Sequence, residues 1–144
     1  MRKGRAVRKG TYLLIFDMPE TEMEVGALGI MRFEEGTYCY VGSAMSGLDQ
    51  RISRHMSKDK KLRWHIDYLT MRGGNMTAYE SANGEDECEL GRIVEESGGS
   101  GCIKGFGCSD CRCSTHLFLL NQASRERICA DARFTPYAQP LVGR

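Results

Sequence analysis

An arginine and a histidine stand four residues apart, Arg51 and His55, in a segment whose apolar residues recur with a helical period. Leu48, Ile52 and Met56 form the apolar stripe, and the i, i+4 spacing places Arg51 and His55 on one ridge at its border. A guanidinium binds a phosphate through two parallel hydrogen bonds, and an imidazole transfers protons near neutral pH. The pair therefore indicates a site for a phosphate-bearing ligand; the alternative is an ordinary surface pair on a helix.

Cysteines are concentrated in a second segment, the Cys-rich range 102–116. Four candidate zinc ligands form a C-x2-C-x-C-x2-H pattern there, and these are Cys108, Cys111, Cys113 and His116. Zinc sites usually pair two separated ligand clusters, whereas this run is compact. The alternatives are a turn of reduced cysteines with His116 hydrogen-bonded, or a thiol nucleophile at Cys111 or Cys113 assisted by His116.

The formal net charge of +1 conceals blocks of opposite sign along the chain. A basic N-terminal arm covers residues 1–9, a second basic block covers 51–63, and acidic residues dominate 80–96. Both basic blocks are candidate phosphate-facing surfaces. The candidate DNA-binding residues of the second block are Arg51, Arg54, Lys58, Lys60 and Lys61. The alternative is an ordinary solvated surface.

The elements that must position these side chains follow from apolar patterning and turn residues. Strands are expected at 10–17, 25–33, 37–41, 76–81 and 116–120, with a hairpin turn at 34–36 between the second and third. Helices are expected from 47 onward, over 64–69, at 86–96 and at 124–132, followed by an irregular tail. The expected fold class is α/β (α+β), with a small central antiparallel β-sheet flanked by helices.

The 144 residues, 41% of them apolar, suffice for one hydrophobic core, so a single domain spanning 1–144 is expected. The longest apolar run, Tyr12 to Phe16, is far too short to cross a membrane, and the N-terminus lacks the apolar stretch of a signal peptide. Seven cysteines, an odd number, favour reduced thiols over a secreted disulfide framework. These observations predict a soluble, cytoplasmic (intracellular) protein without a membrane partner.

Two short motifs carry a family resemblance. Gly10-Thr11-Tyr12 opens the first expected strand, Tyr40-Val41-Gly42 ends the third, and Arg51 and His55 follow on a helix. This arrangement resembles the GIY-YIG nucleases, a family that includes homing endonucleases and the incision subunit of bacterial nucleotide excision repair. Across nearly the whole chain the sequence also resembles an uncharacterised archaeal and bacterial branch, DUF123-like, sometimes fused to endonuclease III. Several family members carry a lysine where this chain has Ser43.

The resemblance implies a set of catalytic residues: Tyr12, Tyr40, Arg51, His55 and Glu87. Tyr12 and Tyr40 would lie close together on the sheet and orient a water, with one acting as general base. An unperturbed phenol titrates near pH ~10, so that role requires a nearby cation. The family's metal ligand, a helical glutamate, corresponds best to Glu87, with Glu89 as the reserve, and Mg²⁺ or Mn²⁺ suits a lone carboxylate plus waters.

The expected function is that of a metal-dependent DNA endonuclease hydrolysing phosphodiester bonds, directed by DNA structure and related to DNA repair, with DNA and DNA-repair proteins as partners. No segment is recognisable as a reader of base edges. His65 and Asp67 are secondary site candidates, with a packed Trp/His pair as the alternative. The alternative functions are a non-catalytic DNA-binding or repair accessory module and a zinc-stabilised interaction domain, with structural Zn²⁺ as its cofactor.

Overall fold

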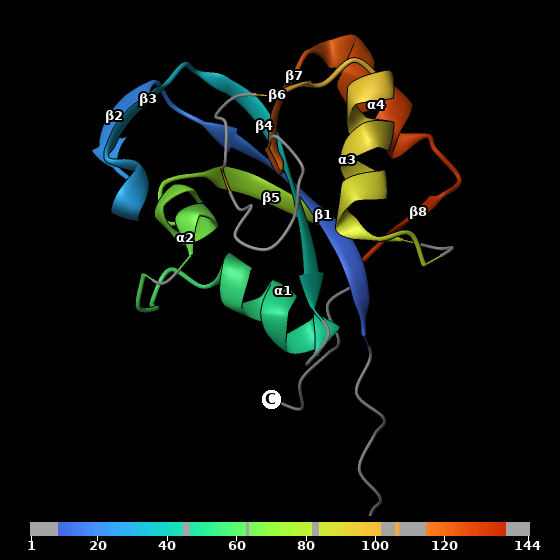
Figure 1. The fold of residues 1–144 in the computed structure, drawn as a ribbon, viewed down its shortest axis with the longest axis horizontal. Helices are drawn as coiled ribbons and strands as arrows, with labels where there is room; N and C mark the ends of the chain where they lie inside the picture. The colour runs from blue at the N-terminus through green and yellow to red at the C-terminus, as the bar shows by residue number, and fades with distance from the viewer. Residues whose placement is uncertain are drawn as a thin grey trace, which may run out of the picture.

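A six-stranded antiparallel sheet with helices on both sides forms the centre of the molecule (Figure 1). The computed structural model describes residues 9–44, 47–62, 64–81, 84–101, 106 and 115–137. Its strands are β1 (Gly10–Met18), β2 (Thr21–Glu24), β3 (Ile30–Phe33), β4 (Gly36–Ala44), β5 (Gly74–Ser81), β6 (Ser100–Gly101), β7 (Leu117–Leu120) and β8 (Phe134–Pro136). Its helices are the 3₁₀ turn η1 (Gly26–Leu28) and α1 (Leu48–Met56), α2 (His65–Thr70), α3 (Glu87–Glu96) and α4 (Gln122–Cys129).

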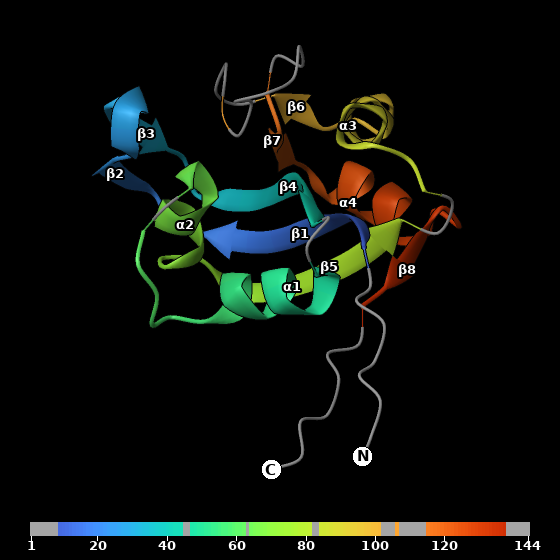
Figure 2. The same ribbon diagram turned by 60° about the horizontal axis from the view of Figure 1, so that its bottom comes forward.

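The strand order of the large sheet is β6-β7-β4-β1-β5-β8, and β1 lies at its centre between β4 and β5. Alternate residues of β1 enter different cores: Tyr12 and Leu14 pack with α1 and α2, whereas Leu13 packs with α3 and α4. Figures 1 and 2 show the two pairs of helices on opposite sides of the sheet. The predicted fold class, a central antiparallel sheet flanked by helices, is confirmed.

The predicted hairpin between 25–33 and 37–41 is wrong. β3 pairs with β2 in a separate two-stranded sheet, while β4 pairs with β1 and β7. The chain reverses inside the segment that the sequence favoured as one strand, because Gly26 and Gly29 adopt φ of +48° and +82°. The backbone N–H of Val25 donates to the carbonyl of Gly29 across that reversal, at 2.8 Å.

Other elements lie close to their predicted positions. Asp86 caps α3 through the backbone N–H of Glu89, and α4 begins at Gln122 rather than at 124. The C-terminal region is not wholly irregular, since β8 pairs with β5. Residues 1–8 of the basic arm and most of the Cys-rich range lie outside the described residues. No helix in the described ranges is long and apolar enough to span a membrane.

The phenol of Tyr12 lies across Gly42, its register partner on β4. A Cβ atom added at Gly42 would lie 2.5 Å from Cζ of Tyr12, closer than real Cβ contacts allow. Glycine is therefore required at the end of the Tyr40-Val41-Gly42 motif because the first motif's tyrosine occupies the space beside it. The two motifs make one contact.

Gly42→Ala is expected to lower the free energy of unfolding by about 1–3 kcal/mol, because the new methyl group displaces a buried ring. Gly74→Ala is the matched control in the same sheet, since nothing lies within 4 Å of its added Cβ; its stability should stay the same or rise by up to about 1 kcal/mol. Urea denaturation measures both. Equal effects of the two substitutions would contradict the close approach of Tyr12.

Candidate active site

A buried tyrosine–histidine pair joins the central strand to the first helix. The hydroxyl of Tyr12 on β1 and Nε2 of His55 on α1 are 2.7 Å apart, and both residues are 1% exposed. His55 reaches the core because it follows the buried Leu48 and Ile52 on the same helical stripe. Its imidazole also lies near Tyr40, with ring centroids 6.1 Å apart. Both predicted tyrosines therefore gather around His55.

Burial keeps this pair neutral at neutral pH. Desolvation raises the pKa of Tyr12 far above its ordinary value, although the charge of Arg51 and a hydrogen bond from it act in the opposite direction. Desolvation, with the charge of Lys60 adding to it, lowers the pKa of His55 to about 3. Nδ1 of His55 is buried and has no hydrogen-bond partner among the described residues. Burial thus disfavours both the phenolate of Tyr12 and the imidazolium of His55.

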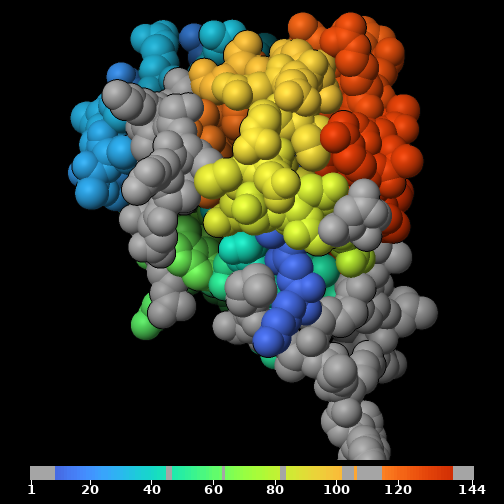
Figure 3. Space-filling model, turned by 45° about the vertical axis from the view of Figure 1, so that its right-hand side comes forward, coloured from blue at the N-terminus to red at the C-terminus, as the bar shows by residue number. Residues whose placement is uncertain are grey.

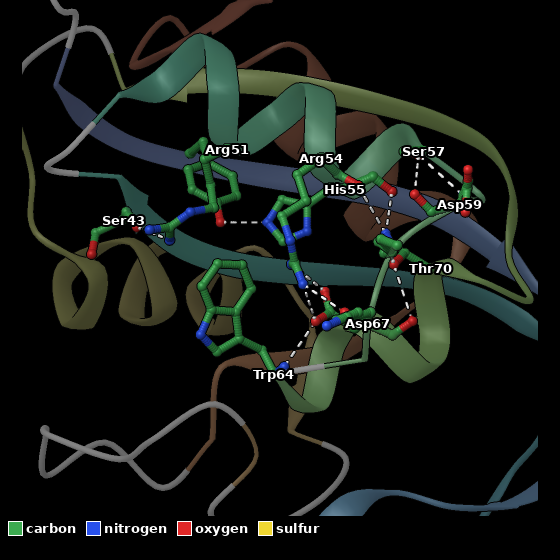
Figure 4. Close-up of polar contacts among 12 residues, drawn as sticks. Ser43, Arg51, Arg54, His55, Ser57, Asp59, Trp64, Asp67 and Thr70 are labelled. Carbon is green, nitrogen blue, oxygen red and sulfur yellow. Dashed lines mark hydrogen bonds and ion pairs between the residues drawn. The ribbon is translucent and has the colours of Figure 1, made fainter.

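Arg51 is the cation beside the pair. One of its terminal nitrogens, Nη1, donates to the carbonyl of Ser43 at 2.8 Å, and its guanidinium lies 4.4 Å from the centre of the Trp64 indole (Figure 4). The side chain is half-buried, so it can be reached from solvent. A guanidinium has five N–H donors, and the contacts named here leave some of them for an anion. Arg51 and His55 lie on one helix, α1, one turn apart, as their i, i+4 spacing predicts.

Glu87 lies on α3, which packs on the opposite face of the sheet from α1. It occupies the first turn of α3, which the hydroxyl of Thr11 ties to β1 by donating to the carbonyl of Glu85 at 2.6 Å. Figure 3 shows α3 at the surface beside the start of β1. The negative charge of Glu87 raises the pKa of both Tyr12 and Tyr40. Glu87 therefore acts electrostatically on both predicted tyrosines.

The Glu87 carboxylate suits a hard divalent cation. Its side chain is 30% exposed, and its Oε2 lies 3.8 Å from Nδ1 of His116, an imidazole whose pKa is lowered by burial. No cluster of three or more His, Cys, Asp or Glu ligands occurs in the described ranges. One accessible carboxylate plus waters fits Mg²⁺ or Mn²⁺ better than an ion that needs a full protein shell. Glu89, the reserve candidate, instead accepts from the backbone N–H of Asp86 in the helix cap.

Three of the five predicted DNA-binding cations also bond within the fold, which leaves them fewer donors for a phosphate. Arg54 donates twice to the buried carboxylate of Asp67, at 2.7 and 2.9 Å. Nζ of Lys58 donates to the carbonyls of Thr70 and Gly73 at the end of α2. Lys60 is fixed in the same way, with Nζ donating to two carbonyls at the end of α1 and to the hydroxyl of Thr70. The exposed Lys61 and the half-buried Arg51 are better placed to meet a phosphate.

The zinc prediction falls largely outside the described residues, which exclude Cys108, Cys111 and Cys113. His116 is described; it is buried, and Nδ1 faces Glu87. Cys39 and Cys129 are free thiols, as expected for reduced cysteines. Cys88 is disulfide-bonded, so the expectation of reduced thiols is wrong at that position.

Asp67 and Trp64 support the site through their contacts with arginines, a role that the sequence did not indicate. Asp67, a secondary candidate, is an internal anchor for Arg54 rather than a group facing a substrate. Trp64 was expected only as a packed partner of a histidine, and it contacts the guanidinium groups of both Arg51 and Arg54. His65 packs against Phe106 instead, with ring centroids 5.4 Å apart. The three-residue spacing of Trp64 and Asp67 could have indicated this arrangement, because it matches the N-cap and N3 positions of a helix start, which they occupy in α2.

A family model described as a domain of unknown function, DUF123, matches residues 11–136. The match runs from the start of β1 to the end of β8 and includes all five predicted catalytic residues. No curated protein and no solved structure is significantly similar to the chain.

The depressed pKa of His55 predicts a stability loss in mild acid. Below pH ~6.5 the unfolded chain takes up a proton that the folded chain binds only near pH 3, so the free energy of unfolding falls by up to about 1.4 kcal/mol per pH unit from this group. His55→Gln, which keeps a hydrogen-bonding group beside Tyr12, should show a correspondingly flatter profile between pH 6 and 4. His65→Gln is the control at a less buried histidine and should remove a smaller part of the slope. Parallel profiles for wild type and His55→Gln would contradict the neutral buried imidazole.

Neighbouring lysines should behave differently on substitution. Lys60→Met leaves the carbonyl of His55 without its ammonium donor and should lower the free energy of unfolding by about 1–3 kcal/mol. Lys61→Met removes an exposed side chain and should change it by less than about 0.5 kcal/mol. Guanidinium chloride denaturation at neutral pH makes the comparison. A larger loss at Lys61 than at Lys60 would show that the ammonium of Lys60 does not support the helix ends.

Proposed function

The chain belongs to the DUF123 family, and we propose that it is a GIY-YIG-type nuclease that hydrolyses phosphodiester bonds in DNA with the help of one divalent metal ion. The observation that carries the proposal is the buried Tyr12–His55 pair beside the Arg51 guanidinium, with Glu87 in electrostatic range. A core tyrosine needs only one hydrogen-bond partner to be stable. A partner that accepts protons, with a cation on one side and a carboxylate on the other, supports a catalytic role.

Tyr12 and His55 together provide a route for the proton of an attacking water. The water gives a proton to the Tyr12 oxygen while Tyr12 passes its own proton to Nε2 of His55, which requires the other imidazole proton to be on Nδ1. The hydroxide adds to phosphorus, the bond to the leaving oxygen breaks, and that oxygen takes a proton from solvent. His55 then returns its proton to solvent through Tyr12.

Substrate binding would make this transfer easier. With no substrate, burial opposes a positive charge on His55. A phosphodiester bound at Arg51 brings a negative charge close to the imidazole, which raises the pKa of His55 toward its ordinary value. The site is therefore expected to take up protons only in the presence of its substrate.

Arg51 and Glu87 supply the charges that the reaction needs. Arg51 would bind the phosphoryl oxygens, since its remaining donors match their geometry. Glu87 would hold Mg²⁺ or Mn²⁺, which when bound neutralises charge on the phosphoryl and leaving oxygens. Among the described residues, few cations near the site lack a partner within the protein, which supports recognition of DNA structure through few backbone contacts.

The first test is cleavage of labelled linear, flapped, branched and abasic DNAs with Mg²⁺ or Mn²⁺. Tyr12→Phe removes the proton relay and should lower the rate by about 10²–10⁴-fold; Arg51→Ala should cost about 10²–10³-fold. Glu87→Gln should abolish metal-dependent cleavage. Glu95→Gln, on an exposed position at the other end of α3, is the matched control and should cleave like wild type.

Chelation with EDTA should stop cleavage while leaving the thermal unfolding midpoint unchanged within about one degree, because a metal held by one carboxylate and waters would add little to a fold built on two apolar cores. Cleavage that survives in both Arg51→Ala and Glu87→Gln would exclude this site. If no DNA is cut and salt-sensitive DNA binding persists, the chain is the non-catalytic DNA-binding module instead.

A further inference from the structure

Arg54 forms the fixed end of a chain of contacts that leads to Arg51. The carboxylate of Asp67 is fully buried and accepts two hydrogen bonds from Arg54 and a third, at 2.8 Å, from the backbone N–H of Trp64. Arg54 also donates to the carbonyl of Lys61 at 2.8 Å. A guanidinium with an ion pair and several hydrogen bonds has little freedom to move, so the Arg54 side chain is held in one position on α1.

The indole of Trp64 lies against both Arg54 and Arg51. The guanidinium carbons of Arg54 and Arg51 lie 4.2 and 4.4 Å from its ring centroid. Both distances are within the range of a cation–π contact. Figure 4 shows the indole below the two arginines, between Ser43 on one side and Asp67 on the other. Arg51 is thus held by the Trp64 ring and by the carbonyl of Ser43, besides its hydrogen bond to Tyr12.

Both arginines contact the Trp64 ring, but in the described part of the chain only one of them is paired with a carboxylate. The positive charge of Arg54 is balanced by the buried carboxylate of Asp67. No carboxylate contacts Arg51 in any ion pair of the described residues. An aromatic ring attracts a cation without neutralising it, so contact with Trp64 orients Arg51 and leaves its charge available to an anion.

We infer that Trp64 is a positioning residue: it holds the Arg51 guanidinium, uncompensated, beside the Tyr12–His55 pair in the orientation that receives a phosphodiester. The inference rests on the proposed function, because the orientation of Arg51 affects the reaction only if Arg51 binds an anionic substrate. A freely rotating arginine would lose side-chain entropy at each binding event, whereas this one has lost it on folding. Trp64 therefore acts on the rate through Arg51 and not by touching substrate.

A double-mutant cycle separates positioning from ordinary packing. Trp64→Leu should lower kcat for cleavage by about 10–100-fold with a smaller change in KM, since small displacements of a positioned group have effects of this size. In the Arg51→Ala background the same substitution should change kcat less than about twofold, because the group it positions is absent. Tyr68→Leu, at another half-buried aromatic packed against the same core, is the matched control. It should have the same small effect in both backgrounds.

Equal effects of Trp64→Leu in both backgrounds would overturn the inference. Trp64→Phe provides a conservative variant that keeps an aromatic ring, and it should recover part of the lost kcat. If Trp64→Leu does not fold, Trp64→Phe replaces it in the cycle with a smaller expected effect.

A second measurement does not depend on cleavage. The Nε–H resonance of Arg51 in NMR spectra of the full chain should carry a ring-current shift from Trp64, assigned by its loss in Arg51→Lys, and this shift should disappear in Trp64→Leu. An inactive wild type that shows the shift would reject the nuclease while retaining the Trp64-held arginine. A resonance that is unchanged in Trp64→Leu would reject the positioning role whether or not DNA is cut.

Discussion

The hydroxyl of Tyr12 is the constraint on which the rest of the structure depends. It is buried inside the layer between the central strand and the first helix, where an unpaired hydroxyl costs about 1–3 kcal/mol. Gly42 leaves the space for the ring, and His55 supplies the partner at 2.7 Å. Together with the packing of Leu48 and Ile52, this contact sets how α1 lies on the sheet and therefore where Arg51 faces.

Strongly local patterns predicted part of the molecule well. The apolar run of β1, the Leu48/Ile52 stripe of α1 and the Asp86 cap of α3 are each specified within a few neighbouring residues, and each lies close to where the sequence places it. The grouping of Tyr12, Tyr40, Arg51 and His55 came from the order of motifs in a family resemblance. Composition and periodicity alone would not have brought two strands and a helix to one point.

Sequence patterns miss contacts that form between distant residues. Gly26 and Gly29, both with positive φ, reverse the chain inside the apolar segment 25–33, and the periodicity of that segment does not indicate the reversal. The basic block at 51–63 suggested a nucleic-acid surface, yet Lys58 and Lys60 bond to carbonyls at the ends of two helices. Helix C-termini attract cations for the same electrostatic reason that phosphates do. A run of lysines therefore has two interpretations until the carbonyls that face it are known.

The sheet edges have a consequence for how molecules of this protein meet one another. At one edge β6 contributes only two residues, and at the other β8 contributes three, the last of which is Pro136. A proline has no backbone N–H to donate, and such short edges offer a neighbouring chain few positions to pair with. Open strand edges are a common route to aggregation, and the outermost strand at each edge of this sheet is short. Crowded solutions of this chain should therefore resist the edge-to-edge stacking that leads to fibres.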